Sequence, residues 1–198
     1  MTRVKDLDPV EHTPEQAMIF KEIAGPRGGV VRGPFAIWLR NPELADKANQ
    51  LGNALRINGK LDKRLFELAI LVVARSWTAQ YEWFAHAEAA LAAGLEASTI
   101  QALQRAEEPN LIKSDEQIVY KVSYELMQDH KVSDATYQQA EQALGLPLLI
   151  ELISVIGFYT MVAVVLNGFE APVPGGSLPL SGNGFAQPIS DRSESSLQ

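Results

Sequence analysis

The stretch from Lys63 to Trp77 constrains the fold more than any other part of the chain. It reads KRLFELAILVVARSW, and from Leu65 to Ala74 it has almost no polar side. A surface helix keeps a polar stripe toward water, whereas a helix that is apolar all round has to be covered by other elements. We therefore expect a helix at the centre of the core. The 198 residues suffice to build that core as one domain.

Cap residues, prolines and glycines predict seven further helices around this one. These run over 14–24, 42–58, 79–93, 98–107, 114–129 and 133–144, and a long apolar helix begins at Pro147. Between the first two lies GPRGGVVRGP, which is too rich in glycine to hold regular structure and should form a loop. No segment alternates apolar and polar residues as a strand does, so the fold class is all-α.

The chain divides into three parts by composition. Residues 1–12 form an N-terminal extension, and residues 13–171 form a single helical domain. Residues 172–198 are an irregular C-terminal tail rich in Pro, Gly and Ser, which cannot build a core of its own. We expect this tail to be flexible or to lie across a neighbouring subunit.

Charge and composition narrow the class of partner. The net charge is −7 and the basic residues are dispersed, which argues against nucleic acid or an anionic membrane and favours a small molecule. The chain contains no cysteine, so it offers no thiolate nucleophile or disulfide. The N-terminal residues have no signal-peptide pattern, and the apolar run over 152–169 is shorter than the roughly 20 residues of a spanning helix. We expect a cytoplasmic protein.

The sequence QYEWFAH, residues 80–86, places an acid and an imidazole on one side of a helix. Glu82 and His86 are four residues apart, so their side chains lie one turn from each other. The neighbouring Tyr81, Trp83 and Phe84 lower the local dielectric constant, which moves the pKa values of both groups toward the range useful for proton transfer. The pair is either a general acid/base site or a polar contact on a helix surface.

Glu67 stands inside the otherwise apolar core helix and needs a partner there. One possibility is a structural ion pair with Lys63 or Arg64, about one turn back. The other is His86 on the next helix, where the carboxylate would fix the tautomer of the imidazole and leave its second nitrogen free for proton transfer. The residues alone leave both open.

A metal ion is a third interpretation, with Glu67, Glu82 and His86 as ligands. The other two histidines, His12 and His130, have no ligand spacing to His86. We therefore expect no metal.

Further polar and aromatic residues are candidates for binding a substrate. An arginine could hold a carboxylate with two parallel hydrogen bonds. The candidates are Arg75, Arg40 and also Arg32 for a carboxylate, with Tyr81, Trp83, Tyr159 and Asn167 lining the pocket.

The segment RLFELAILVVARSWTAQYEWFAHAEAALAAGL resembles the core of the carboxymuconolactone decarboxylase and alkyl hydroperoxidase D-like superfamily. Flanking segments resemble the longer members, so the likeness extends over most of residues 13–175. The resemblance implies an all-α bundle and a homo-oligomer, which we expect to be a dimer, trimer or hexamer.

Two branches of this superfamily imply different chemistry. In the peroxidase branch a glutamate, two cysteines and a histidine form a proton relay; the glutamate and histidine correspond to Glu67 and His86, but the cysteine positions hold Ala79 and Glu82. Peroxide reduction by a cysteine pair is therefore excluded.

The decarboxylase branch implies loss of CO₂ from a small cyclic carboxylic acid or lactone, as in aromatic catabolism, without a cofactor. The decarboxylase branch keeps a Glu and a His at this spacing, which match Glu82 and His86. We expect His86 to transfer the proton, Glu82 to act as a second acid/base or to orient, and Glu67 to hold His86. A hydrolase, hydratase or isomerase using the same Glu/His pair, and a non-catalytic member, remain as alternatives.

Overall fold

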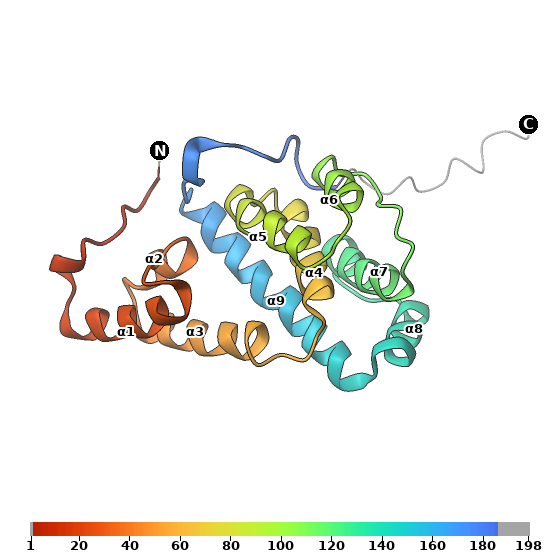
Figure 1. Cartoon of the computed structure of the whole chain (residues 1–198), viewed down its shortest axis with the longest axis horizontal. Coiled ribbons are helices and arrows are strands. Elements are labelled where there is room, and N and C mark those ends of the chain that lie inside the picture. The colour runs from red at the N-terminus through yellow and green to blue at the C-terminus, as the bar shows by residue number, and fades with distance from the viewer. Residues whose placement is uncertain (1, 186–198) are drawn as a thin grey trace, which may run out of the picture.

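The computed structural model describes residues 2–185 and shows an all-α protein (Figure 1). Within those residues there are nine α-helices and no strands, which confirms the all-α fold class; eight of the nine helices are predicted by the sequence. Three short 3-10 helices, Pro9–Glu11, Gly25–Arg27 and Pro174–Gly176, lie in the connections.

Helix α4, Lys63–Ser76, forms the centre of the core. Every residue from Leu65 to Arg75 is buried, because α4 packs against α5 (Gln80–Ala92), α7 (Ser114–Asp129) and α9 (Leu146–Gly168). A helix without a polar side needs cover on all sides, and these three neighbours provide it. The expected central helix is confirmed.

The N-terminal helices α1 (Pro14–Ala24), α2 (Pro34–Trp38) and α3 (Pro42–Arg56) form a separate group beside α9 (Figure 1). Helix α1 begins with a complete capping box between Thr13 and Gln16, and the Asn41 side chain caps α3. The short α2 is absent from the helices predicted by sequence, because its five residues are too few to show a period. It starts at the end of the glycine-rich loop and contacts α9.

The remaining helices are α6, Ala97–Gln104, and α8, Asp134–Leu144. Most predicted boundaries agree with the structure within two residues, but α6 ends three residues earlier than expected. The residues Ser114 to Gln117 have the sequence pattern of a capping box, but no box forms, since Lys113 occupies the N-cap position and makes no side-chain cap.

Helix α9 is longer than the uncharged run in the sequence suggested. It spans 23 residues, and by length and composition alone it could cross a membrane. One side of it is buried in the core, including Leu152, Val155 and Tyr159. The expectation that the apolar run is too short to span is therefore wrong, whereas its predicted place in the core is confirmed.

The beginning of the C-terminal tail packs on the chain's own helices. Leu180 and Phe185 are buried, and the side chain of Gln80 bonds the backbone of Leu180 through both its amide nitrogen and its oxygen. In Figure 1 this segment runs from the end of α9 across α5 toward α6. For residues 172–185, neither flexibility nor a neighbouring subunit is needed to account for the tail; residues 186–198 lie outside the described part of the chain.

Candidate functional site

A cavity of about 300 Å³ lies between the N-terminal helices and the pair α5 and α9. We call it the inner cavity. The α5 side contributes Tyr81, Glu82 and His86, and α9 contributes Phe158 and Tyr159. The opposite wall comes from residues between Arg27 and Phe35 and from α3. The volume of the inner cavity is at the lower end of the range for small-molecule sites.

Glu67 and His86 form a hydrogen-bonded pair at this cavity. The Glu67 Oε2 atom lies 2.7 Å from His86 Nδ1, and Glu67 Oε1 lies 2.8 Å from Lys63 Nζ. Both partners proposed from the sequence, Lys63 and His86, are therefore present together. Bonding at Nδ1 leaves His86 Nε2 as the ring nitrogen available to a ligand.

The same contacts set the charge of Glu67, which is only 2% exposed. Burial on its own would raise the pKa of the carboxyl, but the contacts with His86 and Lys63 outweigh burial and lower the pKa below its usual value. Glu67 is consequently ionised, with a cation on one oxygen and an imidazole on the other.

Glu82 is in the opposite situation, although it stands only one turn before His86. Its side chain is 1% exposed, and neither carboxyl oxygen has a hydrogen-bond partner among the described residues. Burial without a partner raises the pKa of Glu82 well above its usual value. Burial therefore favours the neutral form of this carboxyl, which lines the inner cavity as a potential proton donor.

The expected Glu82–His86 contact is replaced by a different arrangement. His86 pairs with Glu67 instead, and its ring packs edge-on against Tyr159, with 5.1 Å between ring centroids. Tyr159 is 7% exposed, and burial raises the pKa of its phenol. The inner cavity is thus lined by three different polar groups, from His86, Glu82 and Tyr159.

Three arginines line the inner cavity: Arg27, Arg32 and Arg56. Among residues 2–185 none of them forms an ion pair with a carboxylate. Arg27 is held in place, since its Nη1 atom donates to the Ile23 carbonyl at 2.9 Å and to Asn49 Oδ1 at 3.0 Å. Its guanidinium also lies 4.3 Å from the centre of the Phe35 ring. Burial and the nearby charge of Arg56 lower the pKa of Arg27.

The two arginines first proposed for a substrate carboxylate lie outside the inner cavity. Arg75 is buried, and its Nη1 and Nη2 atoms bond the carbonyls of Gln104, Ser181 and Gly182 at 3.0–3.3 Å, so it fixes the tail. Arg40 is exposed, and its Nη2 atom donates to the Lys5 carbonyl at 2.7 Å, which ties down the N-terminal segment. Both placements correct the sequence interpretation, because the partners are distant backbone carbonyls that no local pattern reveals.

Trp83 and Asn167 are also placed elsewhere. Trp83 is buried in the hydrophobic core. Asn167 lies near the end of α9, and its Nδ2 atom donates to the carbonyl of Trp77, which follows α4. Neither lines the inner cavity, whereas Tyr81 and Tyr159 do. Sequence reasoning passed over Arg27, Arg56, Phe35 and Phe158; the only available signal was the cluster of basic residues in the glycine-rich loop.

The described residues contain no group of three or more His, Cys, Asp or Glu side chains that could hold a metal ion. Of the three ligands considered from the sequence, Glu67 and His86 bond each other, and Glu82 lies apart from that bond with both of its oxygens unbonded.

Residues 42–110 match the model of the carboxymuconolactone decarboxylase family. The similarity to this family covers 69 of the 198 residues. The matched segment covers α3 to α6, so it supplies Glu82, His86 and Arg56 of the cavity wall, together with Glu67, which bonds His86. Arg27, Arg32 and Tyr159 lie outside the segment that matches the carboxymuconolactone decarboxylase family. Searches of curated proteins and of solved structures found no match.

Proposed function

We propose that the protein is a decarboxylase that acts by acid/base catalysis on a small cyclic carboxylic acid or lactone, similar to carboxymuconolactone. The observation that carries the proposal is the neutral Glu82 carboxyl, buried without a partner in a cavity that three arginines also line. Such a cavity suits an anion that must gain a proton as it reacts.

Arginines fit the role of binding the acid. A guanidinium makes two parallel hydrogen bonds with a carboxylate and stays charged in an apolar site. Arg27 is the best placed, because its contacts with Ile23, Asn49 and Phe35 fix it before a ligand arrives. Arg56 adds a second positive charge close to it.

The reaction then needs an electron sink and a proton. As the bond between the ring carbon and the carboxyl group breaks, CO₂ leaves and the electron pair moves through the double bond into the lactone carbonyl. Glu82 donates its proton to carbon, the carbonyl re-forms, and the Glu82 carboxylate regains a proton from solvent. One proton is consumed for each CO₂ released.

His86 acts on the carbonyl oxygen in this scheme. With Nδ1–H donated to the ionised Glu67, Nε2 is directed at the carbonyl oxygen, and in the imidazolium form its N–H donates a hydrogen bond to the developing negative charge. Lys63 balances the charge of Glu67 from its other oxygen. The fixed orientation of the ring is what the Glu67 contact contributes.

The burial of the site favours an enzyme over a non-catalytic member of the family. A binding or scaffold protein would have no need to hold an unpaired carboxyl inside a cavity, since that arrangement destabilises the fold. A hydrolase, hydratase or isomerase would use the same residues but would retain the carboxyl group in the product.

The test is a decarboxylation assay with carboxymuconolactone that follows CO₂ release, in D₂O, with the product analysed by NMR. We expect one solvent deuteron on carbon for each CO₂, and a loss of at least a hundredfold in kcat for both Glu82→Gln and His86→Ala. Glu88→Gln is the matched control, because Glu88 is exposed on the same helix and is absent from the cavity wall. Activity unchanged in both site variants contradicts the assignment, and product that retains its carboxyl group favours the other reaction classes.

We also propose that the protein works in the cytoplasm as a homo-oligomer. Helix α9 carries exposed apolar side chains along one side, namely Leu146, Ile150 and Ile153 near its start, and Met161 and Val164 beyond Gly157. Exposed apolar side chains that share one side of a helix are typical of a protein interface. Light scattering should show a dimer, trimer or hexamer, and Ile150→Glu should shift it toward the monomer; a monomeric wild type contradicts the proposal.

A further inference from the structure

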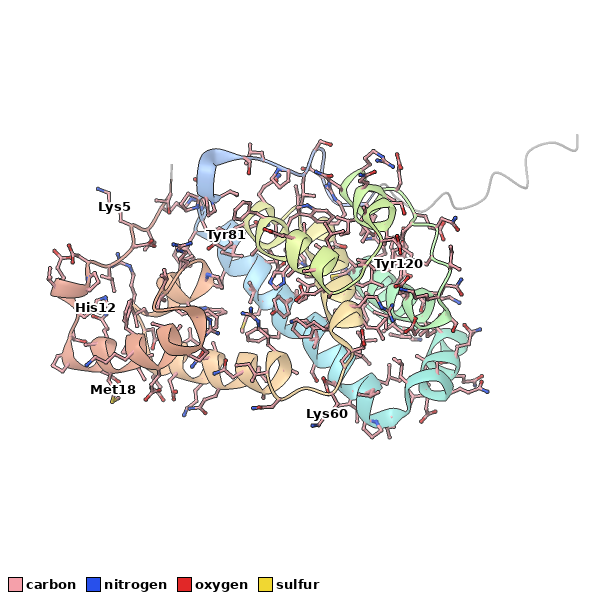
Figure 2. All side chains as sticks on the ribbon, in the orientation of Figure 1. Lys5, His12, Met18, Lys60, Tyr81 and Tyr120 are labelled. Carbon is pink, nitrogen blue, oxygen red and sulfur yellow. The ribbon has the colours of Figure 1, made fainter. Side chains whose placement is uncertain are left out.

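Two more cavities lie against the inner cavity, and Tyr81 lines all three. One has a volume of about 270 Å³ and shares Arg32 and Tyr81 with the inner cavity. The other has a volume of about 420 Å³ and shares Tyr81 and Leu166 with it. We call these two the outer cavities. Tyr81 is labelled in Figure 2 on the side of α5 that faces α2.

The outer cavities are mainly apolar, and two segments of the chain form a wall that both share. The segment from Ala171 to Val173 lines both, together with Thr2 from the N-terminal segment. Arg3 ties the two segments together, since its backbone nitrogen donates to the Phe169 carbonyl at 3.1 Å and its side chain pairs with Glu170 at 2.8 Å. The outer cavities are therefore bounded by contacts of the chain itself.

The ring of Tyr81 packs directly against the backbone of Gly33. The ring lies so close to the backbone that a Cβ atom on residue 33 would come 2.6 Å from Tyr81 Cε1. Gly33 also has φ of +59° and ψ of −132°, a conformation that residues with a side chain rarely adopt. The absence of a side chain at Gly33 thus leaves the space in which the Tyr81 ring lies. Among the described residues, its hydroxyl makes no hydrogen bond that would fix it otherwise.

We propose that Tyr81 limits the length of the ligand, by closing the inner cavity against the outer ones. At roughly 30 Å³ for each water-sized group, the inner cavity holds about ten non-hydrogen atoms. A short acid fits beside Glu82 and His86, and a longer apolar chain meets the Tyr81 ring. The inference rests on the proposed binding of carboxylic acids by the inner cavity, and it assigns the size class of those acids.

The experiment measures the affinity of straight-chain carboxylates, from butyrate to dodecanoate, by isothermal titration calorimetry. For the wild type, affinity should rise by up to about fourfold per methylene as far as octanoate, which has ten non-hydrogen atoms, and then fall. In Tyr81→Ala the rise should continue to decanoate or beyond. Tyr81→Phe is the matched control, because it keeps the ring and should keep the wild-type limit.

Tyr81→Val provides a second variant if the alanine protein does not fold, and it should extend the limit by fewer methylenes. The same length limit in folded Tyr81→Ala or Tyr81→Val as in the wild type overturns this inference, while short acids still bind and the proposed site stands. If no acid binds to either protein, the proposed anion site fails and the inference fails with it. Arg27→Met separates the anion site from the length limit. It should lower the affinity for every acid to a similar degree, without changing the chain length at which affinity is highest.

Discussion

The buried carboxyl of Glu82 predicts a specific dependence of stability on pH. In the folded protein its pKa is raised well above the usual value near 4.5 because the group is buried without a partner. In the unfolded chain the same group ionises as the pH rises past about 4.5. Unfolding therefore releases a proton at neutral pH, and the contribution of Glu82 to stability falls as the pH rises from about 4.5 through the raised pKa.

The slope of this effect follows from linkage. One proton released on unfolding lowers the free energy of unfolding by about 1.4 kcal/mol for each pH unit, for as long as Glu82 stays protonated in the fold. Glu82→Gln cannot ionise, so it removes the slope and leaves a constant offset for an amide without partners. The difference between wild type and variant should thus shift by about 1.4 kcal/mol from pH 5 to pH 6, in favour of the variant.

Urea unfolding followed by tryptophan fluorescence gives the measurement, since the chain has three tryptophans and Trp38 and Trp83 are buried. Taking the difference between the two proteins at each pH cancels the other titrating groups. A difference that stays constant from pH 5 to 7 would mean that Glu82 is ionised in the fold, and the reasoning on its role as proton donor would be refuted.

Glu67→Gln serves as a control of opposite sign. Despite burial, the contacts with His86 and Lys63 lower the pKa of Glu67, so its ionised form stabilises the fold. That stabilisation is fully present above about 4.5 and is lost as the pH falls through the lowered pKa. The difference between wild type and Glu67→Gln should therefore be flat from pH 5.5 to 7 and should shrink in acid.

Three further changes test the fold around the site. Gly33→Ala should lower the free energy of unfolding by about 1–3 kcal/mol in urea titrations, because the positive φ and the Tyr81 ring both oppose a Cβ atom. Thr13→Ala removes the capping box of α1 and should lower the free energy of unfolding by about 1 kcal/mol in the same assay. Arg75→Met removes the bonds to the Ser181 and Gly182 carbonyls, so limited proteolysis should cut the tail severalfold faster than in the wild type; equal rates would contradict the role of Arg75.

The sequence predicted most of the helices because their signals are local. Caps such as Thr13 and Asn41 and an apolar period define a helix within a few residues, independently of the rest of the chain. The Glu67–His86 contact was also accessible as one of two alternatives, because a short turn joins α4 and α5 and makes them neighbours. The five-residue α2 was missed because it is too short for periodicity to show.

Of the three arginines of the inner cavity, Arg32 was a sequence candidate, but Arg27 and Arg56 could not be assigned in the same way. Arg27 lies in a glycine-rich loop, and its position depends on Ile23, Asn49 and Phe35, which come from three different elements. Arg75 looked like a free cation for the same reason, since the carbonyls that bind it are about thirty and more than a hundred residues away. Charge alone does not tell which cation faces a ligand; that depends on tertiary contacts.

Two glutamates fifteen residues apart illustrate how the fold divides chemical roles. Glu67 is buried with a cation and an imidazole on its oxygens, and Glu82 is buried with nothing on either oxygen. Burial is nearly the same for both, so their partners decide that one is ionised and the other neutral. When the surroundings give two neighbouring acids very different pKa values, the two can take different roles. The ionised acid can orient another catalytic group, and the neutral acid can donate a proton.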